Sequence, residues 1–97
     1  MNVEALKAVG GNEWIKGDKH RVYFTQVRLI ELVKAQLAGE TLSNTRANHV
    51  VSLSMAVKVW FDVPTGQFQW TSTHQEWEAR PVADRIISSI KAKAQAA

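Results

Sequence analysis

The chain of 97 residues has 12 Lys and Arg against 9 Asp and Glu, a formal charge of +3, and no cysteine. This length supplies one domain with one hydrophobic core, and the lack of cysteine excludes a disulfide framework and a thiolate metal site. The mild positive charge permits a nucleic-acid partner without requiring one.

Neither a targeting segment nor a membrane span is expected. Glu4 lies near the start and no long apolar run follows it, so the N-terminal residues lack the basic-then-apolar order of a secretory signal. No segment approaches the ~20 apolar residues that a membrane-spanning helix needs. Together with the lack of cysteine, this predicts a cytoplasmic protein without a membrane partner.

Two helices are predicted in the first forty residues. The first covers residues 2–9 and ends at Gly10-Gly11, because glycines favour a helix stop. The second begins after Thr25, a favoured N-cap residue, and ends at Gly39. Its apolar side chains recur at helical spacing: Leu29, Ile30, Val33 and Leu37.

The stretch EWIKGDKHRVYF between these helices predicts a β-hairpin. Pairing Lys16 with His20 places Trp14 opposite Val22 on the apolar face. A shift by one residue sets Trp14 against Arg21 instead and uses the apolar side chains less well. We therefore expect the first register, with Trp14 pointing into the core.

The run that begins at Ser43 supports two interpretations. Its first part is typical of a capped helix, whereas every second residue from 51 to 63 is apolar, as in a strand. A single strand over HVVSLSMAVKVWFDV would be about 50 Å long at ~3.3 Å per residue, too long for a domain of this size. We therefore predict a helix to about Leu53 and a strand from about Ala56.

A second hairpin follows this strand. Val63-Pro64-Thr65-Gly66 suits a turn, because Pro fixes φ at the second position and Gly accepts a positive φ. Pairing Asp62 with Gln67 keeps the apolar residues of both strands on one face, whereas a tighter bulged loop would pair Trp60 with Trp70. The apolar pattern favours the first pairing.

The last helix is predicted to begin near Pro81, because proline suits a first helical position. Trp77, just before it, is interpreted as a plug over one end of the core. Residues 92–97 have little to pack against and are expected to fray. The buried stripe of this helix is Val82, Ala83, Ile86, Ile87, Ile90 and Ala94.

These elements predict a single α+β domain over residues 1–97. Its two hairpins join into a four-stranded antiparallel sheet with helices packed on one face, in the order α-ββ-α-α-ββ-α. Lys58 and Trp60 then lie on the sheet face opposite the core.

Residue spacing indicates neither a cofactor nor a metal site. The three histidines lie far apart, and none has a second ligand at helical spacing: His20, His49 and His74. A nuclease-like set of Asp62, Glu76 and Glu78 lacks a following Lys, and Arg80 is a poor replacement where a proton must move. No phosphate-binding glycine loop is present.

A small ribonuclease of the toxin type would use His20, Arg21 and Tyr23 as acid, phosphate clamp and proton donor. However, His20 and Tyr23 point to opposite faces of a strand, because side chains alternate along it. We therefore expect a protein that is not an enzyme, and keep the ribonuclease as the third hypothesis.

The tip of the first hairpin supplies the main binding candidates: Lys16, Lys19, His20 and Arg21. A protruding basic ribbon fits nucleic acid because Lys and Arg neutralise phosphates, although Lys on a hairpin also discourages edge-to-edge aggregation. Lys58 and Trp60 on the outer face suit base stacking or a protein interface.

The first hypothesis is therefore a non-catalytic domain that engages nucleic acid or a nucleoprotein complex through the basic hairpin, with Lys58 as a further contact. The second is a protein-interaction module, either a stoichiometric inhibitor or a homodimer, with Trp60 as its aromatic anchor.

The sequence resembles small bacterial and phage-type proteins of uncharacterised function, which have an EWxKGxxHRVYF hairpin and later a YDVxTGxF hairpin. The matching residues here are Glu13–Phe24 and Phe61–Phe68, with Phe61 in place of the tyrosine, and Ser43-Asn44 with Ala47 between them. These motifs are hairpin signatures rather than catalytic ones. The resemblance implies a mobile-element setting, where small basic domains act as regulators or inhibitors of host defence, and it assigns no residue a role.

Overall fold

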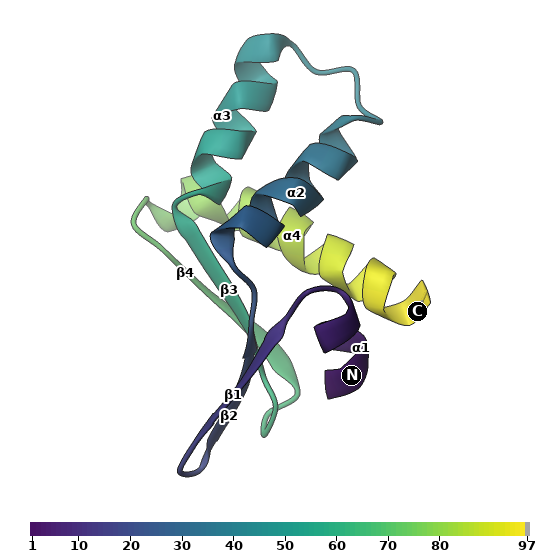
Figure 1. The fold of residues 1–97 in the computed structure, drawn as a ribbon. Coiled ribbons are helices and arrows are strands. Elements are labelled where there is room, and N and C mark those ends of the chain that lie inside the picture. The colour runs from purple at the N-terminus through teal and green to yellow at the C-terminus, as the bar shows by residue number, and fades with distance from the viewer. Residues whose placement is uncertain (97) are drawn as a thin grey trace.

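Helices lie on one side of a four-stranded antiparallel sheet in the computed structural model of this protein, which describes residues 1–96 (Figure 1). The strand order in the sheet is β1-β2-β3-β4, and each strand is antiparallel to its neighbours. The predicted class and element order are confirmed. The elements are α1 Val3–Ala8, β1 Asn12–Lys16, β2 Lys19–Tyr23, α2 Gln26–Leu37, α3 Asn44–Ser54, β3 Val57–Asp62, β4 Gln67–Ser72 and α4 Glu76–Ala96.

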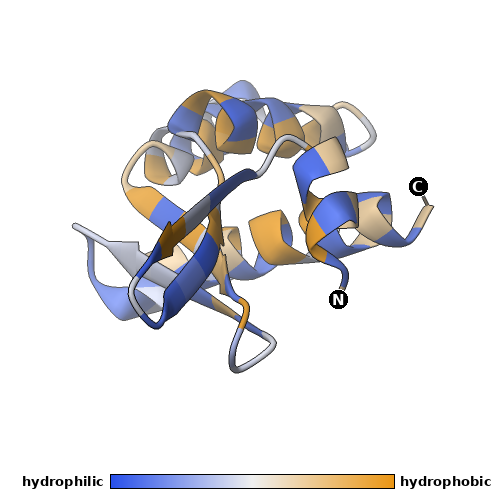
Figure 2. Ribbon diagram, turned by 60° about the horizontal axis from the view of Figure 1, so that its bottom comes forward, coloured by the Kyte–Doolittle hydropathy of each residue, from blue (hydrophilic) through white to orange (hydrophobic). Residues whose placement is uncertain are grey.

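The long helix α4 is the centre of the hydrophobic core. It packs against β3 and β4 on one side and against α1, α2 and α3 on the others. Hydrophobic residues recur along the helices in alternation with hydrophilic ones, as amphipathic packing requires (Figure 2). The side chains that are fully or almost fully buried include Leu6, Val22, Leu29, Leu32, Val33, Val57, Val59, Phe61, Ile86 and Ile90.

The split between α3 and β3 agrees with the sequence prediction. Ser43 caps α3, because its side chain accepts a hydrogen bond from the Arg46 backbone N–H. The helix ends at Ser54 and the strand begins at Val57. Along β3, Val57, Val59 and Phe61 are buried, whereas the alternate side chains are exposed or half-buried, as expected for a strand with one covered face.

The register of the second hairpin is also confirmed. Asp62 pairs with Gln67, and Phe61 therefore meets Phe68 with ring centroids 5.1 Å apart. Gly66 has φ of +69°, the positive value that the turn sequence indicates.

The predicted register of the first hairpin is wrong by one residue. Lys16 pairs with Lys19 and Trp14 with Arg21, around the two-residue turn Gly17-Asp18. Gly17 has φ of +61°, which matches a type II′ turn with Gly at its first central position. Because one residue of shift exchanges the two faces of a strand, Trp14 points away from the core and is 38% exposed.

Two expectations about the last helix are wrong. It begins at Glu76 rather than near Pro81, which lies inside it. Pro81 has no N–H to bond to the carbonyl of Trp77, and its ring crowds that carbonyl, so this turn of the helix is weakened. Ala79, which precedes Pro81, is fully buried. Trp77 is 74% exposed and covers no end of the core.

Residues 92–96, which were expected to fray, continue α4, and Ala94 is buried. Ala97 lies outside the described residues. Over residues 1–96 no helix has the length and hydrophobicity needed to cross a membrane.

Candidate functional site

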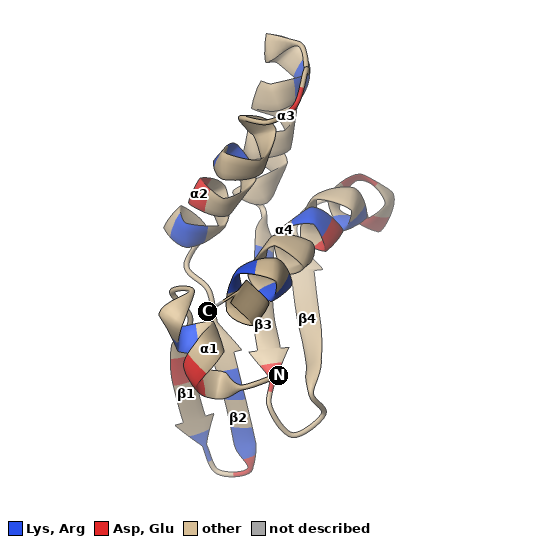
Figure 3. Ribbon diagram, turned by 90° about the vertical axis from the view of Figure 1, so that its right-hand side faces the viewer, with Lys and Arg blue, Asp and Glu red and all other residues tan. Residues whose placement is uncertain are grey.

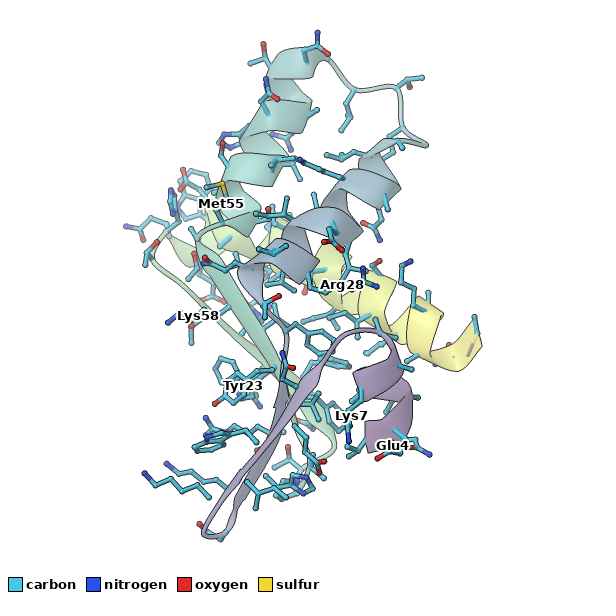
Figure 4. The ribbon with its side chains drawn as sticks, in the orientation of Figure 1. Glu4, Lys7, Tyr23, Arg28, Met55 and Lys58 are labelled. Atoms are coloured by element: carbon cyan, nitrogen blue, oxygen red, sulfur yellow. The ribbon has the colours of Figure 1, made fainter. Side chains whose placement is uncertain are left out.

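The sheet face that points away from α4 is not covered by any helix of the described chain (Figure 1). Because Val22 pairs with Phe61 on the buried face, the alternate residues of β2 and β3 lie on the opposite side, which we call the outer face. Tyr23 and Lys58 project on this side, away from the helices (Figure 4). The outer face of the first three strands consists of Asn12, Trp14, Lys16, Lys19, Arg21, Tyr23, Lys58, Trp60 and Asp62.

Three aromatic rings from three adjacent strands form a contiguous row on this face. The Trp14 and Tyr23 ring centroids are 6.0 Å apart with planes at 80°, an edge-on contact. The Tyr23 and Trp60 centroids are 5.9 Å apart with planes at 34°. Trp14 is exposed, whereas Tyr23 and Trp60 are half-buried. We call these three residues the aromatic row.

Arg21 holds the aromatic row together rather than standing free in solvent. Its Nη1 donates a hydrogen bond of 2.9 Å to the Tyr23 hydroxyl, and its guanidinium lies 5.5 Å from the Trp60 ring centroid. Its Nε lies 4.0 Å from a carboxylate oxygen of Asp62. Arg21 therefore contacts other residues of the chain, and the prediction that it is a free cation of the hairpin tip is wrong.

The free positive charges lie at the two ends of the outer face. Lys16 and Lys19 flank the hairpin tip, where the sequence placed them, and Lys58 lies near the opposite end of β3. None of these three lysines belongs to an ion pair with another residue of the described chain. Blue segments mark the basic residues beside the tip in Figure 3.

The hairpin tip extends beyond the rest of the sheet. Of the β2 residues that pair with β3, Arg21 lies nearest the hairpin tip. One residue closer to the tip, the carbonyl of His20 accepts a hydrogen bond from the N–H of Val63, just after the end of β3. Residues 16–19 therefore continue past the end of β3 without a further strand beside β2, and both tip lysines are exposed. This projection agrees with the expectation for the tip.

His20 lies on the opposite side of the hairpin from the aromatic row. Its Nε2 is 2.6 Å from a carboxylate oxygen of Glu13, and Lys7 of α1 is 3.7 Å from the other oxygen. His20 is thus not brought together with Lys16, Lys19 or Lys58, although the sequence grouped them. It is also separated from Tyr23, so the acid and proton donor of the ribonuclease hypothesis do not meet.

The contact with His20 changes the pKa of Glu13. The hydrogen bond from His20, assisted by the charge of Lys7, holds the pKa of Glu13 below its ordinary 4.5. A lowered pKa stabilises the fold above the ordinary value, and this contribution is lost as the pH falls through the lowered pKa. In His20→Ala we expect the Glu13 carboxyl titration, followed by NMR, to move up toward 4.5. An unchanged midpoint would contradict this contact.

Metal-ligand groupings are not found among residues 1–96, where no three His, Asp or Glu side chains are placed to share an ion. Two of the three carboxylates considered for a nuclease centre have other partners: Asp62 accepts a hydrogen bond from the Thr65 hydroxyl, and Glu76 pairs with Arg80. The outer face is therefore taken as the candidate site.

Sequence reasoning found the lysines and Trp60 of this site but missed Trp14 and Tyr23. The signal that identifies them is the Gly17-Asp18 pair, because Gly at the first position of a two-residue turn fixes the register that turns Trp14 outward. The chain matches no protein-family model, no curated protein and no solved structure.

Proposed function

We propose that this protein binds single-stranded nucleic acid on the outer face of its sheet. The observation that supports this most directly is the aromatic row on an uncovered face, between lysines that have no acidic partner within the described chain. Proteins that bind single strands combine a basic track for the backbone with aromatic rings on which bases stack. We expect no catalytic step in this activity.

The aromatic row favours single strands over duplexes. Bases in a duplex are stacked on one another, whereas unpaired bases can stack on aromatic side chains. Trp14 offers an exposed ring for such a base, and Tyr23 and Trp60 extend the surface across two more strands. The projecting tip alone would also fit a duplex groove, so a preference for duplex would favour the tip over the aromatic row as the main contact.

Arg21 prepares this surface before binding. Its contacts with Tyr23, Trp60 and Asp62 fix the orientation of two rings, which reduces the conformational entropy that binding has to remove. Asp62 neutralises part of its charge, so we assign phosphate contact to Lys16, Lys19 and Lys58 instead.

Lys16→Ala is expected to reduce the salt dependence of binding. Each phosphate contact on a single strand contributes about 0.7 to the slope of log K against log salt, so removal of Lys16 lowers that slope by about 0.7 for any base sequence. Fluorescence anisotropy of a labelled oligonucleotide over a salt series measures it. Lys34→Ala, an exposed change on α2, is the matched control and should leave the slope unchanged. Equal slopes in wild type and both variants would remove Lys16 from the interface.

A protein partner is the competing occupant of the outer face, since an aromatic centre with a polar rim is also typical of protein interfaces. Oligonucleotide binding distinguishes a nucleic-acid partner from a protein partner. An affinity for oligonucleotide that falls steeply with salt supports the proposal, whereas no oligonucleotide binding would favour Trp60 as the anchor of a protein interface. We place the proposed activity in the cytoplasm, as a regulator or inhibitor of a nucleoprotein complex in a mobile-element setting.

A further inference from the structure

The edge strand β4 lacks the usual protection of a sheet edge. Its sequence QFQWTS contains no charged residue and no proline, and Figure 3 shows β4 without an acidic or basic segment along its whole length. The other edge strand, β1, contains Glu13 and Lys16. Natural proteins place charges, prolines or bulges on exposed edges because an unpaired strand otherwise recruits another. β4 therefore differs from β1 as a surface for association.

The backbone groups that β4 leaves free are defined by its pairing with β3. The N–H of Thr73 bonds to the carbonyl of Ala56. Hydrogen-bonded pairs alternate along an antiparallel ladder, so Gln67, Gln69 and Thr71 direct their N–H and C=O groups toward β3. The backbone groups of the alternate residues point outward from the sheet edge: Phe68, Trp70 and Ser72.

Two surface clefts lie along the inner side of this edge. One, of about 430 Å³, lies beside Trp70 and Ser72 under the first turns of α4, where Glu76 and Arg80 line it. The other, of about 550 Å³, is lined by residues that include Phe68, Trp70, Asp84, Ile87 and Lys91. Phe68 and Trp70 are only half-buried, and each is partly covered by a cation: Lys91 lies 5.7 Å from the Phe68 centroid and Arg80 lies 5.6 Å from that of Trp70. The inner-face side chains Phe68 and Trp70 are therefore only partly covered by α4 beside the free edge of β4.

We propose that a second copy of this chain occupies this edge, so that two β4 strands pair antiparallel about a two-fold axis and form one continuous eight-stranded sheet. A two-fold axis at Trp70 pairs Phe68 of each copy with Ser72 of the other and uses all three outward-pointing residues. The same patch then serves both partners, as an isologous interface requires.

The composition of β4 favours a second copy over a charged strand. Because QFQWTS has no charged residue, the antiparallel pairing of two β4 strands sets no like charges opposite one another, and the outward-pointing backbone groups of Phe68, Trp70 and Ser72 meet the same three residues of the second copy. The interface lies outside the aromatic row, and the dimer does not depend on the proposed nucleic-acid binding.

Charge reversal at the edge tests this proposal. Gln69 and Thr71 are exposed on the outer face of β4, and in the paired strands Gln69 of one copy lies next to Thr71 of the other. Gln69→Lys/Thr71→Lys and Gln69→Glu/Thr71→Glu each place like charges opposite one another, which destabilises cross-strand pairs. By light scattering without nucleic acid, we expect wild type to have twice the chain mass, each variant alone the single mass, and an equimolar mixture of the two variants the double mass again.

Circular dichroism establishes that both variants retain the fold. A wild type that stays monomeric at millimolar concentration overturns the proposal, as does a dimer that persists in both variants or a mixture that stays monomeric. If either variant unfolds, disulfide cross-linking provides the test. Gln69→Cys/Thr71→Cys should cross-link between copies in a protein that otherwise has no cysteine. Val27→Cys, an exposed change on α2, should not, and equal cross-linking of both variants overturns the proposal.

Discussion

Trp14→Ala is expected to weaken binding of a single-stranded oligonucleotide by about 5- to 150-fold, the loss of about 1–3 kcal/mol that accompanies removal of one stacked base. Trp14 is the most exposed ring of the aromatic row and has no role in the buried core. The fold should therefore survive the change, and fluorescence anisotropy at low salt measures the loss directly.

Trp77→Ala is the matched control for this prediction. Trp77 is also exposed, at 74%, but it lies in the first turn of α4 and outside the outer face. Its removal should leave oligonucleotide affinity unchanged, although Trp77 is more exposed than Trp14. If the two substitutions weaken binding equally, the contact is nonspecific; if Trp14→Ala has no effect, the aromatic row is not the platform.

Gly11→Ala is expected to lower the free energy of unfolding by about 1–3 kcal/mol, the usual cost of forcing an extra methyl group into a packed core. A Cβ at Gly11 would lie 2.4 Å from Cγ1 of Val22 and 3.0 Å from the carbonyl oxygen of Leu6. Val22 is fully buried, so its side chain has no free space into which to move, and the Leu6 oxygen belongs to the backbone and cannot rotate away. Denaturant unfolding followed by tryptophan fluorescence measures the change.

Gly39→Ala provides the comparison. The nearest atom to a Cβ there is the Gln36 carbonyl oxygen at 3.8 Å, an ordinary contact. Replacing this glycine should leave stability unchanged or raise it by about 0.4–1 kcal/mol, because alanine restricts the unfolded chain. A Gly11→Ala protein as stable as Gly39→Ala would show that α1 does not pack on β2 as closely as the structure indicates.

The second hairpin was predictable because its two signals are compatible. Pro64 and Gly66 place the turn, and the apolar alternation along β3 selects the pairing of Asp62 with Gln67 over the bulged alternative. In the first hairpin, the apolar pattern and the turn sequence favour different registers. Apolar matching favours Trp14 in the core, whereas the turn favours Trp14 outside, and the turn decides because only the short helix α1 covers β1 on its inner side.

The prediction of where α4 begins was wrong for a related reason. Proline is favoured at a first helical position and costs about 3 kcal/mol in a helix interior, so local sequence pointed to a start at Pro81, yet Pro81 lies inside α4. Burial of Ala79 and the acidic residues Glu76 and Glu78 in the first turn favour the longer helix. That early start takes Trp77 out onto the surface, and no local sequence pattern indicated this.

Of the candidate site, only the free lysines and Trp60 could be predicted from the sequence. Lys16, Lys19 and Lys58 could be identified from hairpin and strand positions alone. The fate of Arg21 depended on which side chains faced it, and Asp62, Tyr23 and Trp60 come from two strands that are far apart in sequence. Contacts of this kind follow from tertiary pairing and not from local composition.

The turn at Gly17-Asp18 makes the spacing of this hairpin as important as its residues. One additional residue inserted there would shift the register of β1 by one residue, which exchanges its two faces. The Trp14 indole would then lie on the helix side, and the Glu13 carboxylate would take its place on the outer face. Variants that conserve every side chain but lengthen this loop would thus lose the outermost ring of the surface, so the length of the connection should be under stricter selection than its chemistry.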